Sequence, residues 1–203
     1  MSTHPSRTDL RKALREQRRA LAGQARHRLE HRLLGHLLRH RFWREARHIA
    51  LYLPNDGEVD LSALIDRACG EQKTLYLPVL RGHSLRFAPV TPRTRLRLNR
   101  FGIPEPALPP SQLRDARRLD LILMPLVGFD EKGNRLGMGG GFYDRSLAFM
   151  HGEARRPHPR LVGVAFERQR LPALPHAPWD VPLRAVLTEN RLQAFARSWR
   201  THA

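Results

Sequence analysis

The chain has 203 residues, which predicts a single domain large enough to form a core of its own. It contains no apolar stretch near the ~20 residues of a membrane-spanning helix, and its arginine-rich start lacks the apolar segment of a secretory signal. A single cysteine, Cys69, excludes an internal disulfide, so we expect a cytoplasmic protein in which Cys69 is a small packing residue.

The formal net charge is +17 at pH 7, and nearly all of the basic residues are arginines. A charge of this size suggests nucleic-acid binding. The arginines are, however, spread along the whole chain, without the interleaved basic and aromatic residues that stack nucleic-acid bases. A small polyanionic substrate would be attracted by the same field, so charge alone leaves both classes of partner open.

Residues 5–41 predict two helices that are separated at Gly23. Ser6 and Asp9 form a capping box ahead of apolar residues at helical spacing. The other face of the first helix is basic, and its spacing alone predicts a solvated surface. It carries Arg11, Lys12, Arg15, Arg18 and Arg19.

His48–Leu53 predicts a strand that ends at a turn over residues 54–57, with Glu58 at its exit. In an open α/β sheet, ligands bind at the carboxyl ends of the strands, so Glu58 is placed to meet one. A first-turn carboxylate that supports the following helix is the alternative.

The middle of the chain continues the alternation of helices and strands. Residues 61–69 predict a helix, and 74–80 and 84–90 predict strands. The loop 101–106 contains two prolines, and we expect its Glu105 to fix the loop by a hydrogen bond rather than to bind a ligand.

Leu119–Met124 predicts a buried strand, residues 128–134 a loop, and residues 142–150 a helix. Between them stands a glycine-rich turn, Gly137–Gly141. Glycines let the backbone approach an anion and point successive N–H groups at it, and Arg135 and Arg145 flank the turn, so the segment predicts a phosphate cradle. It matches neither the Walker A nor the dinucleotide-binding pattern.

Asp144 is an unusual neighbour for a phosphate cradle, because a carboxylate repels phosphate unless a cation lies between them. It therefore suggests Mg²⁺. A helix cap or an ion pair with Arg145 explains Asp144 as well, and the chemistry leaves these alternatives open.

The last part of the chain predicts strands at 161–166 and 184–188 and a closing helix at 189–199, with Trp179 and Asp180 in an irregular segment. The alternating elements indicate a single α/β domain over residues 1–203. We expect a mainly parallel sheet flanked by helices, with an N-terminal helical segment (1–45) packed on it.

Residues 135–145, preceded by Pro125 and 129–130, resemble the signature of the 5-formyltetrahydrofolate cyclo-ligase (5,10-methenyltetrahydrofolate synthetase) family. Met138 and Phe142 stand where the common family form has tyrosine. The segments 11–15, 52–60 and 179–183 resemble three further landmarks in the same order, and Trp179 replaces the usual histidine. We assign Trp179 no role in proton transfer.

The resemblance implies a three-layer α/β fold. It also implies ATP-dependent conversion of 5-formyltetrahydrofolate to 5,10-methenyltetrahydrofolate, ADP and phosphate, with Mg²⁺ as cofactor. The substrates are the expected partners; the protein is expected to be a monomer that binds neither membrane nor nucleic acid. It assigns Leu53 and Glu58 to the folate and Asp144 and Asp180 to Mg²⁺, and no residue is assigned as general acid or base. The residues assigned to ATP are Arg11, Lys12, Arg15, Arg135, Gly137, Met138, Gly139, Gly140, Gly141, Phe142, Tyr143, Asp144 and Arg145.

Two other functions compete with this interpretation. A phosphoryl-transfer enzyme or ligase that acts on another small acid would need the same ATP site. A basic nucleic-acid-binding protein would account for the arginines, but it leaves Glu58, the glycine turn and Asp180 unexplained.

Overall fold

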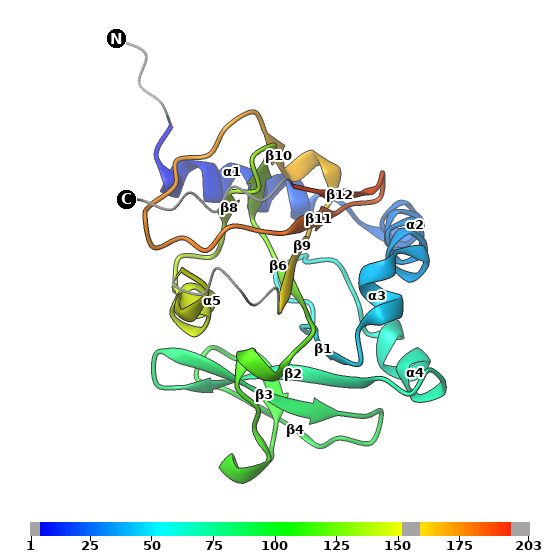
Figure 1. Cartoon of the computed structure of the whole chain (residues 1–203). Helices are drawn as coiled ribbons and strands as arrows, with labels where there is room; N and C mark the ends of the chain where they lie inside the picture. Colours follow the sequence, from blue (N-terminus) through cyan, green and yellow to red (C-terminus); the bar gives the residue numbers. More distant parts are fainter. Residues whose placement is uncertain (1–4, 152–158, 196–203) are drawn as a thin grey trace.

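The structure is a computed structural model that describes residues 5–151 and 159–195. Its centre is a seven-stranded sheet in the order β12-β11-β9-β6-β1-β2-β3 (Figure 1). The strands from β11 to β2 run parallel, whereas β12 and β3 join the two edges antiparallel. The strands are β1 (His48–Ala50), β2 (Thr74–Arg81), β3 (Ser84–Val90), β6 (Leu121–Pro125), β9 (Arg160–Val164), β11 (Ala185–Leu187) and β12 (Leu192–Ala194).

Helices cover both faces of this sheet. The helices α2, α3 and α4 lie on one side of it and α5 lies on the other, while α1 crosses near the top of Figure 1. The helices are α1 (Arg7–Arg19), α2 (Gly23–Arg39), α3 (Arg41–Glu45), α4 (Ala63–Gly70) and α5 (Phe142–Leu147). The predicted three-layer α/β architecture, with its mainly parallel sheet and N-terminal helices, is therefore confirmed.

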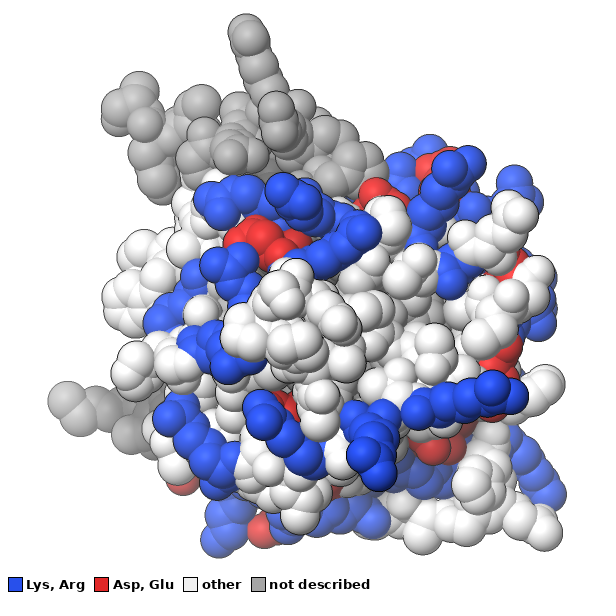
Figure 2. Space-filling model, turned by 90° about the horizontal axis from the view of Figure 1, so that it is seen from below, with Lys and Arg blue, Asp and Glu red and all other residues white. Residues whose placement is uncertain are grey.

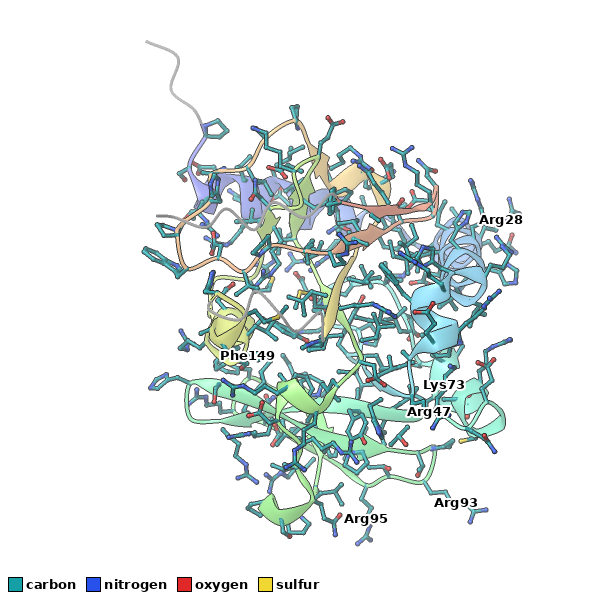
Figure 3. All side chains as sticks on the ribbon, in the orientation of Figure 1. Arg28, Arg47, Lys73, Arg93, Arg95 and Phe149 are labelled. Atoms are coloured by element: carbon teal, nitrogen blue, oxygen red, sulfur yellow. The ribbon has the colours of Figure 1, made fainter. Side chains whose placement is uncertain are left out.

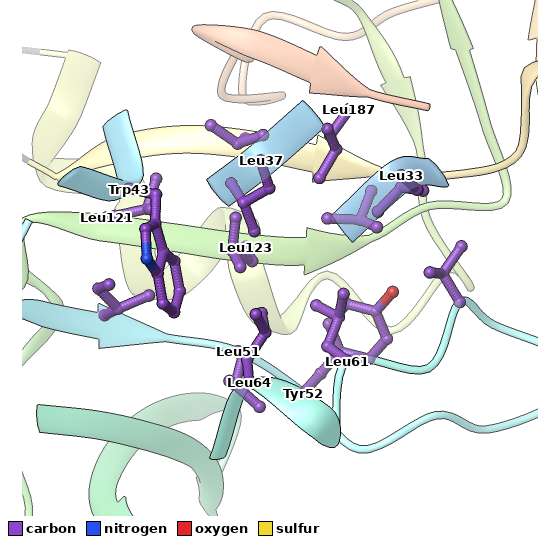
Figure 4. Packing of buried hydrophobic residues seen from close by; sticks show 14 of the residues in the cluster. Leu33, Leu37, Trp43, Leu51, Tyr52, Leu61, Leu64, Leu121, Leu123 and Leu187 are labelled. Atoms are coloured by element: carbon purple, nitrogen blue, oxygen red, sulfur yellow. The ribbon is translucent and has the colours of Figure 1, made fainter. Parts of the chain in front are cut away.

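The central strands bury side chains on both faces, as parallel strands between two helical layers do. On β6, Leu121 and Leu123 join the core under α2 and α3, which Figure 4 shows with Leu33, Leu37 and Trp43 packed against them. The alternate residues of β6 join a second core that includes Leu147 of α5. The nearly continuous apolar run of β6 is the sequence signal of this double burial.

Short 3₁₀ turns and two small sheets complete the fold. The 3₁₀ turns span Pro110–Gln112, Ala116–Arg118, Ala148–His151 and Glu167–Gln169, so the predicted helix 142–150 is an α-helix only to Leu147. One small sheet orders β10 (Arg170–Leu171), β7 (Gly128–Asp130) and β8 (Arg135–Leu136), and the other pairs β4 (Leu96–Leu98) with β5 (Pro104–Pro106). A third core, which contains Leu14, joins α1 to the first small sheet.

Two local predictions are confirmed. Ser6 and Asp9 form the capping box of α1, in which the Asp9 amide donates to Ser6 Oγ at 3.2 Å. Glu105 is buried and accepts a hydrogen bond from the Leu80 amide at 3.0 Å, so it fixes its loop as expected. Among the described residues, no helix is long and apolar enough to cross a bilayer.

The predicted closing helix at 189–199 is wrong over the described part of that segment. The Thr188 hydroxyl accepts from the amides of Asn190 and Arg191, and this turn sends the chain back as β12 against β11. Pairing with an open sheet edge outweighs the weak helix propensity of so short a segment. The remainder, residues 196–199, lies outside the described residues.

Two further expectations also need correction. Cys69 is exposed, so it is not a packing residue of the core. The predicted loop at 128–134 is a hairpin, with β7 as its first strand. The Asp130 carboxylate accepts from the amides of Lys132 at 2.9 Å and Asn134 at 3.0 Å, and Gly133 has φ of +84°, so the expected turn residues close the hairpin.

Candidate functional site

The glycine turn follows the β7–β8 hairpin, which occupies the predicted loop between the central strand β6 and the turn. Gly139 and Gly141 have φ of +99° and +63°, values that residues with a Cβ atom rarely adopt. A Cβ atom on Gly140 would lie 2.7 Å from the Phe142 ring. Because α5 is only a turn and a half long, its dipole is small, and the turn's backbone amides are the stronger candidates for contact with an anion.

The first helix lies against this turn. The Arg11 side chain donates from Nε to the Gly137 carbonyl at 2.9 Å, and its guanidinium carbon lies 3.5 Å from where a Cβ atom of Gly139 would be. The neighbouring Lys12 is exposed. Of these two neighbouring cations, the structure places Arg11 at the glycine turn.

Arg15 does not lie against the glycine turn. Its Nε donates to Asp56 Oδ2 at 2.6 Å, in the turn that follows β1. The structure therefore separates Arg15 from Arg11 and groups it with the segment that carries Glu58.

The two flanking arginines hold the ends of the glycine turn. Arg135 is buried, pairs with the Asp144 carboxylate and donates to the Val181 carbonyl. Arg145 is exposed and donates to the His83 carbonyl at 2.5 Å and to the Gly140 carbonyl. Both guanidinium groups are thus partly occupied by the protein itself.

The segment around Asp180 lies beside the glycine turn. The Val181 amide donates to Asp144 Oδ1 at 3.4 Å, which brings Asp144 next to the residue after Asp180. The Asp180 carboxylate accepts from Arg7 Nη1 and from the Ala177 amide, both at 2.9 Å. Two acidic residues that are far apart in sequence therefore belong to one neighbourhood.

Glu58 lies in the turn after β1, and its side chain is buried, with a residue exposure of 8%. Burial raises its pKa to about 7, against the opposing effects of Arg18 and of the Asn55 amide, which donates to Glu58 Oε2 at 3.2 Å. A carboxylate that is kept in a low-dielectric site with so few partners is typical of a binding site.

The turn that carries Glu58 and the segment after the glycine turn are close enough for the charge of Glu58 to act on Tyr143. Burial raises the pKa of Tyr143, and the negative charge of Glu58 raises it further. Tyr143 belongs to α5, directly after the glycine turn, whereas Glu58 follows β1. Because β1 and β6 are parallel neighbours, their carboxyl ends lie at one edge of the sheet, and this edge brings the two motifs together.

The remaining predicted residues surround this neighbourhood. Leu53 is partly buried and packs against the first core. Met138 is 48% exposed and Trp179 is 69% exposed, which places both apolar side chains at the surface. Phe142 is half-buried and makes an edge-on contact with Phe101, at 5.6 Å between ring centroids.

The sequence interpretation missed Arg18 and Asp56. Arg18 was placed on the solvated face of the first helix, but it is buried between Leu14 and Leu21 on the apolar stripe. Its spacing from those two leucines was the signal that could have identified it. Asp56 receives Arg15, Arg18 and Arg19 from the same helix, so it is the docking point of α1 on this turn.

The family model and the relatives that match this chain point to the same family. The model of the 5-formyltetrahydrofolate cyclo-ligase family matches residues 3–189. A 5-formyltetrahydrofolate cyclo-ligase from Haemophilus influenzae is 40% identical over 184 residues, which are 89% of this chain and 96% of that protein. One from Escherichia coli K12 is 41% identical over 150 residues, 72% of this chain and 80% of that protein.

A solved structure agrees with this result. The NMR structure of the 5,10-methenyltetrahydrofolate synthetase from Aquifex aeolicus superposes with a TM-score of 0.80 at 33% identity and covers 97% of both chains. The family match covers the first helix, Glu58 and the glycine turn. The chain therefore belongs to the 5-formyltetrahydrofolate cyclo-ligase family.

Proposed function

We propose that this protein converts 5-formyltetrahydrofolate to 5,10-methenyltetrahydrofolate with ATP, and that both substrates meet at the carboxyl edge of β1 and β6. The observation that carries the proposal is the parallel pairing of β1 and β6, because it supports placing the turn that carries Glu58 and the segment that leads to the glycine turn at one edge of the sheet. The electrostatic effect of Glu58 on Tyr143 agrees with this placement. Family membership supplies the reaction class. The geometry supports one composite site.

The glycine turn and Arg11 would hold the triphosphate. The turn offers backbone amides. Arg11, which donates a hydrogen bond to the Gly137 carbonyl, adds a positive charge that does not depend on pH in the working range. Arg135 and Arg145 hold the ends of the turn and add to the positive field. Arg15 and Lys12 would contribute at longer range, since Arg15 is paired with Asp56 and Lys12 is exposed.

Glu58 would hold the folate, with Leu53 beside it. The pterin presents adjacent N–H donors on its 2-aminopyrimidinone edge, and an ionised carboxylate accepts such a pair well. The bound donors also replace the water that Glu58 has lost by burial. Folate binding should therefore favour the ionised form of this side chain.

Asp144 and Asp180 would hold Mg²⁺. The donor set fits, because Mg²⁺ takes oxygen ligands and is bound by one or two carboxylates together with phosphate oxygens and water. No cluster of three acidic, histidine or cysteine side chains suited to a metal occurs within the described residues, which agrees with a site that substrate phosphates complete. When bound, the ion would neutralise charge on the phosphates.

The chemistry requires positioning rather than covalent help from the protein. The formyl oxygen is a poor leaving group; transfer of the γ-phosphoryl group to it converts it to a phosphate ester. N10 then attacks the formyl carbon and loses its proton, the ring closes and inorganic phosphate departs with that oxygen. The chain orients the two substrates and stabilises negative charge. The raised pKa of Tyr143 keeps its phenol protonated, so its O–H group is present to donate a hydrogen bond at neutral pH.

An assay for the methenyl product tests the proposal. Purified protein is mixed with 5-formyltetrahydrofolate, Mg²⁺ and ATP, and near-ultraviolet absorbance of the product is followed with and without ATP. An ATP-dependent rise is expected. Bound ATP without product would point instead to a phosphoryl-transfer enzyme or ligase with another acid as its acceptor.

The surface charge argues against the nucleic-acid alternative. On the face shown in Figure 2, basic side chains are scattered with acidic ones between them. Arg28, Arg93 and Arg95 point away from the molecule in different places (Figure 3). Arg7 and Arg15 of α1 pair with Asp180 and Asp56, which reduces the positive charge that this helix offers to a nucleic-acid backbone.

A further inference from the structure

Arg18 is a charged side chain in the protein core. It is 1% exposed and lies on α1 between the buried Leu14 and Leu21, in the stripe that packs the helix on the rest of the fold. Burying a guanidinium group is unfavourable unless its charge and its donors are satisfied. A purely structural role at this position would be met as well by leucine or methionine, so the charge requires a separate explanation.

The contacts of Arg18 join the ends of two central strands. Its Nε donates to the Asp56 carbonyl at 3.0 Å, its Nη2 to Asp56 Oδ2 at 2.9 Å and its Nη1 to the Leu126 carbonyl at 3.0 Å. The same Nη1 lies 3.8 Å from Glu58 Oε1. Asp56 and Glu58 follow β1, and Leu126 follows β6, so the guanidinium group lies beneath the carboxyl edge at which the proposed site is built.

Asp56 does not depend on Arg18 for its charge balance, because Arg15 and Arg19 also pair with it. Glu58 differs. Among the described residues, the groups that face its carboxylate are Arg18 from α1, Asp56 and the Asn55 amide from its own turn, and the phenols of Tyr52 and Tyr143. Arg18 is the cation of this set, and it opposes the rise that burial causes in the Glu58 pKa.

We propose that Arg18 is a positioning residue for folate: its buried guanidinium group keeps the Glu58 carboxylate ionised and fixes the turn that presents it to the pterin. The inference rests on the folate role proposed for Glu58. Without the cation, Glu58 would be neutral over more of the working pH range, and a neutral carboxylic acid can accept only one of two adjacent N–H donors while its own O–H group opposes the other.

The test compares Arg18→Met with Arg26→Met. Arg26 holds the same turn from α2, through the Gly57 carbonyl at 3.1 Å and the Glu58 carbonyl, but the carboxylate that it pairs with is Glu30, at 2.9 Å, rather than Glu58. The KM values for 5-formyltetrahydrofolate and for ATP are measured from about pH 6 to about pH 9, together with kcat.

For Arg18→Met we expect the folate KM to rise about tenfold at about pH 6, below the wild-type pKa of Glu58, and about twofold at about pH 8, with the ATP KM unchanged at both. The pH at which folate binding improves should move upward by about 1, because a cation near a carboxylate stabilises its charged form. Arg18→Lys, which keeps the charge, should restore the pH dependence. In a Glu58→Gln background, Arg18→Met should have no further effect on the folate KM.

An equal rise in folate KM for Arg18→Met and Arg26→Met, with the pH dependence unchanged in both, would show that Arg18 only holds the turn, and the inference would be overturned. If the methionine variant does not fold, Arg18→Gln carries the same test, because it retains a donor for the Asp56 carbonyl without the charge. An unchanged folate KM in Glu58→Gln itself would instead refute the folate site of the proposed function.

Discussion

Glu58→Gln separates two effects of a buried carboxylate, its cost to folding and its benefit to folate binding. The pKa of Glu58 is about 7 in the folded chain, against an ordinary value of 4.5. At about 1.4 kcal/mol per pKa unit, the ionised side chain lowers the free energy of unfolding by about 3 kcal/mol. Glutamine has a similar shape and no charge, so the variant avoids this loss.

The direction with pH follows from proton binding. The folded chain holds the Glu58 proton more tightly than the unfolded chain. The stability that this bound proton contributes is therefore fully present below pH 4.5 and is lost as the pH rises to about 7. Relative to the wild type, Glu58→Gln should therefore gain about 2–3 kcal/mol of stability between about pH 5 and about pH 8. At about pH 8, the folate KM of Glu58→Gln should be about tenfold higher than that of the wild type, or more.

Urea denaturation at both pH values measures the first effect, and steady-state kinetics measures the second. Glu30→Gln is the matched control: Glu30 is also buried, at 6% exposed, but it pairs with Arg26 at 2.9 Å and accepts from the Asp60 amide. Its loss should lower stability at both pH values. If the stability of Glu58→Gln relative to wild type is the same at both pH values, Glu58 is not held in a destabilised ionised form and the reasoning fails.

Three further predictions concern the rest of the site and its surroundings. Asp144→Asn should lower turnover by about 100-fold or more by weakening Mg²⁺ binding; normal Mg²⁺-dependent turnover would refute the metal assignment. Gly140→Val should raise the ATP KM by about tenfold or more, since its Cβ atom would collide with the Phe142 ring at 2.7 Å and displace the turn; an unchanged ATP KM would count against the cradle. Tyr52→Phe should leave the melting temperature unchanged or raise it, because the buried Tyr52 hydroxyl has no hydrogen-bond partner among the described residues. Tyr76→Phe should lose about 1 kcal/mol, because that hydroxyl lies 3.1 Å from His48 Nδ1. Equal losses in the two thermal scans would show that the Tyr52 hydroxyl is paired.

Local sequence patterns were enough for much of the fold and for the main motifs. The apolar run of β6 reports burial on both faces of a parallel strand, and the capping box of Ser6 and Asp9 acts within a few residues of itself. The glycine turn could be recognised because positive φ values restrict residue choice at single positions. Such signals are short-range, so they can be read directly from the chain. The edge strand β12 was missed because pairing with β11 is a tertiary interaction.

The composition of the site depended on the tertiary structure. Only the adjacency of β1 and β6 brings Glu58 near Tyr143, and only the packing of residues 177–181 brings Asp180 near Asp144. Helical periodicity determined that α1 has a buried stripe, but it could not show that Arg18 within that stripe meets a carbonyl and a carboxylate from other segments. The sequence thus determined which chemical groups the protein has, and the order of the strands decided which of them act together.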